Sequence, residues 1–381
     1  MRNMEFPKYV IEPAHADAST GVQPAAHAET VIEKVFSRPR AWQDSEHQLA
    51  RRILTCLFEK RRLLAEDETD GRRETTDFER EAEPHMDRIL RAIRTNRPLD
   101  LVLPAFPAKS PNRQKTLGHL PDLAEKHALQ NLQTLCDDIA SVYGPGAKVI
   151  ICSDGRVFAD LVCIPDAEVT AYGEYLRNYA LTTHGDRFSF FNLDDAFQQT
   201  YSYDILREEL LILYGESIAS LYRRCKEEKE AKAMYLGITR FIFEDYSGIE
   251  PFCSGSRTAI QKVARLIAYR VIQRSNAWSR LLEDRFPDAL RLSIHPQFRV
   301  SQKIGVYLGD TNGDGWLTPW HSVAVRHNGK ISFSKRKDAE GCGMLAYDEG
   351  RPSHFEILDL ENPLLRRNST RGDNHDSDRK T

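Results

Sequence analysis

Residues 99–118 read LDLVLPAFPAKSPNRQKTLG, an apolar run that is followed at once by a proline-rich polar loop. The run at 99–106 is typical of a buried strand, and the prolines behind it stop regular structure. The loop then places cations, a hydroxyl and amides within seven positions: Lys109, Ser110, Asn112, Arg113, Gln114 and Lys115. This composition suits an anion, but it is also common in solvated loops, and the residues alone leave both interpretations open.

Strand-like and helical segments alternate beyond this stretch. Residues 120–144 predict a helix closed by Gly144, and 147–155 predict a strand ending in an Asp-Gly turn, with 156–164 as a possible extension of that strand. Further strands are predicted at 186–193, 289–297 and 303–309, and further helices at 202–233 and 256–275. The alternation predicts an α/β fold, a Rossmann-like layered sheet with helices on both faces, preceded by an N-terminal helical segment.

The pattern divides the chain into four parts. Residues 1–45 lack sustained periodicity and are expected to form a flexible arm, and 46–98 form the helical segment. Residues 99–362 are expected to form the Rossmann-like core, and 363–381 a disordered tail.

Composition narrows the class of protein. The net charge of −3 gives no basic surface for nucleic acid, and no apolar run approaches the roughly 20 residues of a membrane span. The N-terminus lacks the apolar segment of a secretory signal. Seven scattered cysteines without a CxxC pair predict a reduced, cytoplasmic protein without a zinc site.

Four chemically versatile residues follow predicted strands. Ligands of open α/β sheets bind outside the carboxyl ends of the strands. If the three strands concerned are parallel neighbours, one edge of the sheet collects Lys109, Asp154, Arg156 and His295. Asp154 and His295 suit proton transfer, although the residues alone also allow a simple turn aspartate and favour a packed histidine.

The helix at 256–275 offers a second anion site. Ser254 or Ser256 can cap it, and the free N–H groups of a helix start attract phosphate. Helical spacing places Arg257 on the apolar face, which predicts an inward side chain with an anionic partner. The alternative is that the helix frays at Arg257 and the side chain reaches solvent.

Two motifs near the C-terminal end carry less chemistry. Residues 310–315 begin like an EF-hand loop, but His321 stands where calcium needs a bidentate glutamate, so a turn between strands is the better interpretation. Trp316, Trp320 and His321 either line a pocket for an aromatic substrate or belong to the core.

Several motifs together resemble the pyoverdine/dityrosine biosynthesis family, the isocyanide (isonitrile) synthases. They are FPAKSPN, LPDLAEK, SDGRVFADLV, GITRFIFED, RLSIHPQ and WLTPWH, and the resemblance covers roughly residues 46–350. It implies a Rossmann-like domain that joins an L-amino acid, L-tyrosine or L-tryptophan, to ribulose 5-phosphate. The sugar's ketone carbon becomes the isonitrile carbon, with neither metal nor nicotinamide as cofactor.

The resemblance also suggests roles, which chemical type distributes among the residues. A phosphate site is expected from Lys109, Ser110, Arg113 and Lys115, helped by Arg257. Proton transfer is expected from His295 and Asp154, and enolate stabilisation from Lys109 or Arg156. Arg291 or Arg257 would hold the amino acid's carboxylate. Replacing Lys109 with methionine is expected to abolish turnover and to leave the fold intact.

Two alternatives stay open. The product could be N-formyl-tyrosine, as in dityrosine walls, or the chain could be a non-catalytic module that binds a sugar phosphate or an amino acid. The family resemblance further implies a separate iron/2-oxoglutarate oxygenase that modifies the product.

Overall fold

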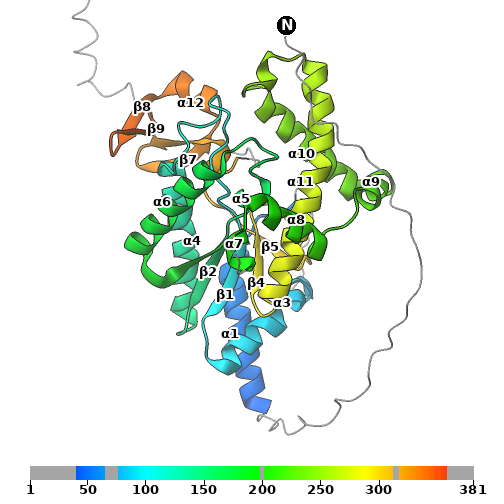
Figure 1. The fold of residues 1–381 in the computed structure, drawn as a ribbon. Coiled ribbons are helices and arrows are strands. Elements are labelled where there is room, and N and C mark those ends of the chain that lie inside the picture. Colours follow the sequence, from blue (N-terminus) through cyan, green and yellow to red (C-terminus); the bar gives the residue numbers. More distant parts are fainter. Residues whose placement is uncertain (1–39, 65–75, 198–200, 312–316, 358–381) are drawn as a thin grey trace, which may run out of the picture.

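The computed structural model describes residues 40–64, 76–197, 201–311 and 317–357 (Figure 1). Most of the expected N-terminal arm, the tail at 363–381, and Trp316 with most of the EF-hand-like turn lie outside the described residues. None of the helices in the described part is long and apolar enough to cross a membrane. All seven cysteines are free.

The central sheet has five parallel strands in the order β3-β2-β1-β4-β5. Their bounds are β1 Leu99–Pro104, β2 Ala147–Cys152, β3 Phe188–Phe191, β4 Leu290–Ser293 and β5 Lys303–Gly305. The chain proceeds outward from β1 to β3 and then returns to the other side of β1 with β4. Ligand sites in open parallel sheets lie at this reversal of strand order.

Helices cover both faces of this sheet, because alternate residues of each strand are apolar on opposite faces. Leu101 and Leu103 belong to a core shared with four helices, whereas Val102 belongs to a core on the opposite face. The first set is α1 Arg40–Glu59, α3 Thr76–Thr95, α4 Leu123–Val142 and α6 Asp166–His184. The second is α7 Leu193–Ala196, α8 Tyr203–Tyr214 and α11 Arg257–Arg285. The predicted α/β fold, with a parallel sheet flanked by helices, is confirmed.

Two helices form a lobe against the first half of α11. They are α9 Ile218–Glu227 and α10 Lys229–Tyr246, and they close two small cores with Ile260, Ala264 and Ile272 of α11. The single long helix predicted at 202–233 is wrong, because the chain is extended at Gly215, Ser217 and Glu228. Three shorter helices, α8 to α10, take its place.

A second, four-stranded sheet was not predicted. It has the order β7-β6-β9-β8, with bounds β6 Val323–His327, β7 Lys330–Ser334, β8 Met344–Asp348 and β9 Arg351–Ile357. Helix α12, Arg336–Cys342, connects β7 to β8. Figure 1 shows this sheet and the lobe of α9 and α10 on opposite sides of the molecule.

The segment after β2 also differs from the prediction. Residues 156–164 do not extend the strand, since α5 spans Gly155–Phe158 and turns follow it. The chain therefore turns away directly after Ser153, which leaves Asp154 at the start of a short helix.

Candidate active site

The loops that follow β1 and β2 are packed against each other at the carboxyl edge of the central sheet. The Ser153 hydroxyl donates to the carbonyl oxygen of Phe106 at 2.9 Å. A Cβ atom at Gly155 would lie only 1.8 Å from the carbonyl oxygen of Pro107, so any larger residue there would force the loops apart. This contact fixes the position of Asp154 relative to the β1 loop.

The prediction that three strands carry site residues to one edge is confirmed at the level of the sheet. Strands β2, β1 and β4 are parallel neighbours, and the loops after them carry Asp154, Lys109 and His295 respectively. Whether the side chains also meet depends on the surroundings of each one.

Lys109 is fully buried in an ion cluster. Its Nζ lies 2.8 Å from Asp122 Oδ2 and 2.8 Å from Glu125 Oε2, and it donates to the carbonyl oxygen of Pro319 at 3.0 Å. Burial alone would lower the pKa of Lys109, but the two carboxylates raise it above its ordinary value, so the ammonium stays charged. All three donors of the ammonium have protein acceptors.

The partners of Lys109 are positioned by the start of α4. Asp122 and Glu125 form a capping box: Asp122 accepts from the backbone N–H of Ala124 at 2.9 Å, and Glu125 accepts from that of Asp122 at 3.0 Å. The fully buried Tyr172 on α6 donates its hydroxyl to Glu125 Oε1 at 3.3 Å. Burial raises the pKa of Glu125 against the pull of Lys109.

Asp154 is the least compensated carboxylate of this region. Its Oδ1 is buried without a hydrogen-bond partner, while the residue as a whole stays partly open to solvent. Desolvation raises the pKa of Asp154 to about 7. Asp154 lies near the Lys109 loop, because its neighbours Ser153 and Gly155 contact Phe106 and Pro107. Its charge also adds to those of Glu125 and Asp122 in raising the pKa of Tyr172. A carboxyl with a pKa near neutrality can both accept and donate a proton.

Residues 318–321 cover the β1 loop. The backbone N–H of Ser110 donates to the carbonyl oxygen of Trp320 at 2.9 Å, and the Trp320 ring packs on Phe106 with centroids 5.4 Å apart. Trp320 is thus a core residue, as one of its two interpretations proposed. His321 is partly exposed, and its ring packs edge-on against Phe241 at 4.7 Å.

Residues 112–115 of the polar loop connect the lobe of α9 and α10 with the second sheet. Lys115 Nζ lies 2.6 Å from Asp245 Oδ1 of α10, and Asn112 donates to the carbonyl oxygen of Glu244 at 3.1 Å. On the other side, Arg336 of α12 donates to the carbonyl oxygen of Arg113 at 2.7 Å.

The four loop residues predicted to bind phosphate therefore do not converge. Lys109 and Ser110 are buried, Lys115 is paired with Asp245, and Arg113 is exposed. The expected socket is corrected on this point, because hydrogen bonds that tie the loop to its neighbours draw these groups in different directions.

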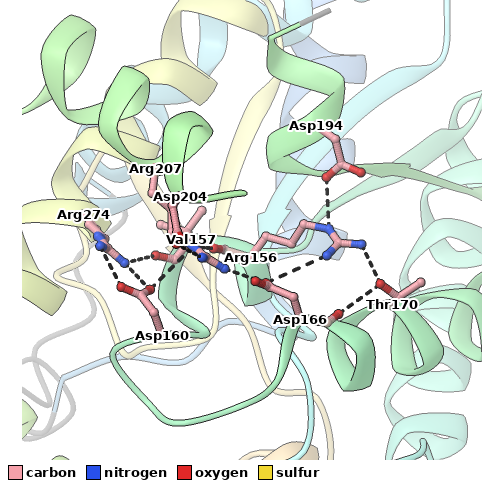
Figure 2. A network of polar contacts seen from close by, with 9 residues as sticks. All are labelled: Arg156, Val157, Asp160, Asp166, Thr170, Asp194, Asp204, Arg207 and Arg274. Atoms are coloured by element: carbon pink, nitrogen blue, oxygen red, sulfur yellow. Dashed lines mark hydrogen bonds and ion pairs between the residues drawn. The ribbon is translucent and has the colours of Figure 1, made fainter. Parts of the chain in front are cut away.

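Arg156 is held in a network of ion pairs (Figure 2). Its guanidinium lies 3.1 Å from Asp194 Oδ1 and donates to Thr170 Oγ1 at 2.9 Å. The buried Arg207 donates to the carbonyl oxygen of Arg156 at 2.7 Å and lies 2.5 Å from Asp166 Oδ1. The network anchors α5 directly behind Asp154.

Arg257 is exposed at the start of α11, so the predicted inward orientation is wrong. Its guanidinium lies 5.5 Å from the centre of the Phe243 ring. The first residue of a helix lies where the chain enters from the loop, and its side chain need not follow the apolar face of later turns. Ser256 caps this helix, as expected, by accepting from Ala259 N.

His295 and Arg291 come from β4 and the loop behind it, whereas Asp154 follows β2. His295 has exposed surface, yet desolvation by the surrounding protein, followed by the charges of Arg62 and Lys303, lowers its pKa to about 4. Arg291 is buried on the face of the sheet under α11, where it donates to Ser279 Oγ at 3.2 Å. The structure thus groups Asp154 with Lys109, and His295 with the β4–β5 side of the sheet.

A cavity of about 860 Å³ is lined mainly by residues of α4, around the end of α1 and in the loops next to β5, and Asp154 is not among them. Its lining includes Arg62, His127, Asn131, Pro296 and Tyr307. We place the candidate site at Asp154 instead, because the buried, uncompensated carboxyl lies there. Within the described ranges, no group of three or more His, Cys, Asp or Glu residues could hold a metal ion.

Four residues of this region were not predicted from the sequence: Asp122, Glu125, Tyr172 and Asp245. The spacing of Asp122 and Glu125 is a recognisable capping box, but that pattern predicts a helix start rather than partners for a lysine. Tyr172 lies in the middle of a helix, and only the fold brings it to Glu125.

Similarity to known proteins defines the class of this chain. A family model for the pyoverdine/dityrosine biosynthesis protein matches residues 89–344. An L-tryptophan isonitrile synthase of Fischerella ambigua is 40% identical over 81% of this chain and 91% of its own length. An L-tyrosine isonitrile synthase of Pseudomonas aeruginosa is 42% identical over 82% of this chain and 95% of its own.

The solved structures agree. The crystal structure of the PvcA protein from Pseudomonas aeruginosa superposes with a TM-score of 0.75 at 42% identity, covering 81% of this chain and 99% of that one. The chain belongs to the pyoverdine/dityrosine biosynthesis family. Because its relatives at 40–42% identity are isonitrile synthases, it is an enzyme of the isonitrile synthase type.

Proposed function

We propose that the enzyme converts the amino group of L-tyrosine or L-tryptophan to an isonitrile, with ribulose 5-phosphate as the carbon donor. The observation that carries the proposal is the similarity to L-tyrosine and L-tryptophan isonitrile synthases over more than four-fifths of the chain. The donor comes from the resemblance of the sequence motifs to this family.

The geometry supports Asp154 as the group that moves protons. Condensation of an amine with a ketone, and enolisation of the adduct, both need a group that exchanges protons near neutral pH. Asp154 has a pKa of about 7, an unpartnered buried oxygen and some exposed surface through which a substrate can approach. Lys109 acts as a positioning residue, because its ammonium is held by Asp122, Glu125 and Pro319.

One incubation tests the proposal. The purified enzyme is mixed with ribulose 5-phosphate carrying carbon-13 at the ketone carbon, and with L-tyrosine or L-tryptophan. After a neutral quench, mass spectrometry is expected to find an isonitrile that carries the label. A labelled formamide would favour N-formyl-amino-acid formation instead, and unchanged substrates would contradict both reactions and leave a binding module.

The quench must be neutral because acid hydrates isonitriles to formamides. As the family resemblance implies, a separate iron/2-oxoglutarate oxygenase would then act on the product. Adding such an enzyme after the first incubation is expected to consume the isonitrile, and its persistence would argue against that partner.

A further inference from the structure

Two cations face each other on the side of the central sheet that α11 covers. Arg291 of β4 and Lys303 of β5 are direct partners in the parallel register, so their side chains emerge side by side. Both reach the same hydroxyl: Arg291 donates to Ser279 Oγ at 3.2 Å and Lys303 donates to it at 3.1 Å. Ser279 belongs to α11, which closes the site from above the sheet.

The positive charge at this place has no ion-pair partner among the residues that the structure describes. Among the residues that the structure describes, no carboxylate lies within 4.0 Å of either Arg291 or Lys303. The carboxylate that acts on both, Glu283, is exposed and farther away, and Arg88 adds a further positive charge near Arg291. Like charges on neighbouring strands destabilise a sheet.

Arg291 also has an unused donor. The residue is only 5% exposed, and its Nε is buried without a hydrogen-bond partner. A buried donor without an acceptor is costly, and a buried charge without a partner is more so. Lys303 and Ser279 are only partly buried, so a ligand can reach the pair from solvent. Desolvation lowers the pKa of both Arg291 and Lys303, as expected for cations that lack an anion.

We infer that Arg291, Lys303 and Ser279 form a binding site for a phosphate monoester. The reason is charge balance: two cations without a protein carboxylate are matched by a dianion, and a phosphate monoester carries about −1.5 to −2 at neutral pH. A carboxylate would leave one positive charge in place. The free Nε of Arg291, the Lys303 ammonium and the Ser279 hydroxyl supply donors from three elements.

The strand register relates this site to Asp154: Arg291 pairs with Val102 of β1, which pairs with Ile150 of β2, the strand that leads into Asp154. Cys152, at the end of β2, responds to both groups: burial raises the pKa of its thiol, Arg291 opposes this rise and Asp154 adds to it. The thiol therefore lies near Arg291 as well as near Asp154. A sugar phosphate anchored at Arg291 and Lys303 would extend toward Asp154, and this identification of the ester rests on the proposed function.

Binding of inorganic phosphate to the full-length enzyme tests the site directly. Isothermal titration and the thermal midpoint are measured for the wild type, Lys303→Met and the control Lys330→Met, which changes an exposed lysine of β7. Phosphate is expected to raise the midpoint of the wild type and of the control. Lys303→Met is expected to bind phosphate at least about ten-fold more weakly. Without phosphate, its midpoint is expected to equal or exceed that of the wild type, because a repulsive pair is removed.

The two sources of the phosphate group are separated by a second titration. Ribulose 5-phosphate and ribulose are compared on the wild type, Lys303→Met and Arg291→Met. If the group belongs to the substrate, ribulose 5-phosphate binds the wild type more tightly than ribulose does, and both variants lose this advantage. If the site holds only free phosphate, the variants lose inorganic phosphate and keep their affinity for the ester.

Unchanged affinity for inorganic phosphate and for the ester in both variants would overturn the site. These binding measurements do not require that the enzyme turns over its substrates. Labelled isonitrile from Lys303→Met at an unchanged KM for ribulose 5-phosphate would exclude the substrate's phosphate from this place and leave the proposed function standing. If the wild type binds phosphate but makes no isonitrile, and Lys303→Met loses this binding, the site stands and the proposed function fails.

Discussion

Two groups of cations lie on or beside helix α11, and only the first group is paired with carboxylates. In the network of Figure 2, Arg156, Arg207 and Arg274 each meet one or more aspartates. The second group lies farther along the helix, where Arg291 of β4 and Lys303 of β5 both donate to the hydroxyl of Ser279. The first group satisfies its charges within the protein and holds α5 in place. The second group leaves hydrogen-bond donors and positive charge without a carboxylate partner, as expected of a site that binds an anionic ligand.

The same contrast separates two residues at the edge of the sheet. Lys109 has three protein partners, whereas Oδ1 of Asp154 has none. Both follow strands of one sheet, and chemical type alone gave both a catalytic role. Compensation distinguishes the group that supports the site from the group that can react in it.

The largest expected effect is at Asp154. Asp154→Asn keeps the size of the side chain and removes its proton exchange, so turnover is expected to fall by roughly 10²–10⁴. Asp186→Asn, at a side chain that is 88% exposed, is the matched control and should retain activity. Labelled product is quantified by mass spectrometry, and near-normal turnover of Asp154→Asn would remove this residue from the mechanism.

The same variant has a pH signature in stability. The pKa of Asp154 is raised by desolvation from 3.8 to about 7 in the folded protein. Between pH 4 and pH 7 the unfolded state has therefore lost a proton that the folded state keeps, so stability falls as pH rises through this window. Asp154→Asn lacks this loss, and its thermal midpoint relative to the wild type is expected to increase from pH 4 to pH 7.

The next effect is at Lys109. Lys109→Met leaves Asp122 and Glu125 buried without their cation, which is expected to cost about 3–5 kcal/mol of unfolding free energy. Urea unfolding measures it, with Lys148→Met as the control at a half-exposed lysine. The structure therefore changes the expectation from sequence that this variant leaves the fold intact. If Lys109→Met and Lys303→Met were equally stable, a cation with carboxylate partners would matter no more for stability than one without them, which contradicts this expectation.

A smaller effect is expected within the network of Figure 2. Arg207→Lys keeps the charge but loses the planar fork that contacts Arg156 O, Asp166 and Asp204 together. A loss of about 1–3 kcal/mol is expected in urea unfolding. Arg223→Lys, on the exposed side of α9, should change stability little. A stability equal to wild type in Arg207→Lys would mean that the network does not anchor α5.

The smallest effect concerns His321. Burial, and then Lys115 and Lys109 against the opposing charge of Asp245, lower its pKa from 6.5 to about 4. The unfolded state therefore takes up a proton first as pH falls below 6.5, and stability is lost between pH 6.5 and pH 4. His321→Gln is expected to reduce this loss by about 1 kcal/mol or less at pH 6. Parallel stability curves for the two proteins from pH 7 to pH 5 would contradict the assignment.

The sequence was sufficient for the strands of the central sheet and for the loops behind them, but the order of the strands comes from the structure. The apolar runs at 99–106 and 147–152, separated by a periodic helix, predict two buried parallel strands, and both occur. The second sheet was missed because β7 and β8 are only partly buried, so they lack continuous apolar runs. The breaks at Gly215 and Glu228 were missed because helical spacing continues on both sides of them.

The site was predictable only in part. Strand ends locate Asp154 and Lys109, because position after a strand is a local property of the sequence. Which cation is compensated is not local: Lys109 meets Glu125 through the start of another helix, and Arg291 meets Lys303 through the register of two strands. The loop was misjudged for the same reason: the partner of Lys115 lies on α10, and Arg336 of α12 donates to the backbone carbonyl of Arg113.

The strand order also has a kinetic consequence. Strands β1, β2 and β3 follow one another with α4 in the first connection and α5 and α6 in the second, whereas β4 joins β1 only after the entire helical lobe has been synthesised. Closing so long a loop is entropically unfavourable, and non-local parallel pairing is slow. During refolding, the half of the sheet with Asp154 should therefore gain protection from hydrogen exchange before β4 and β5 do.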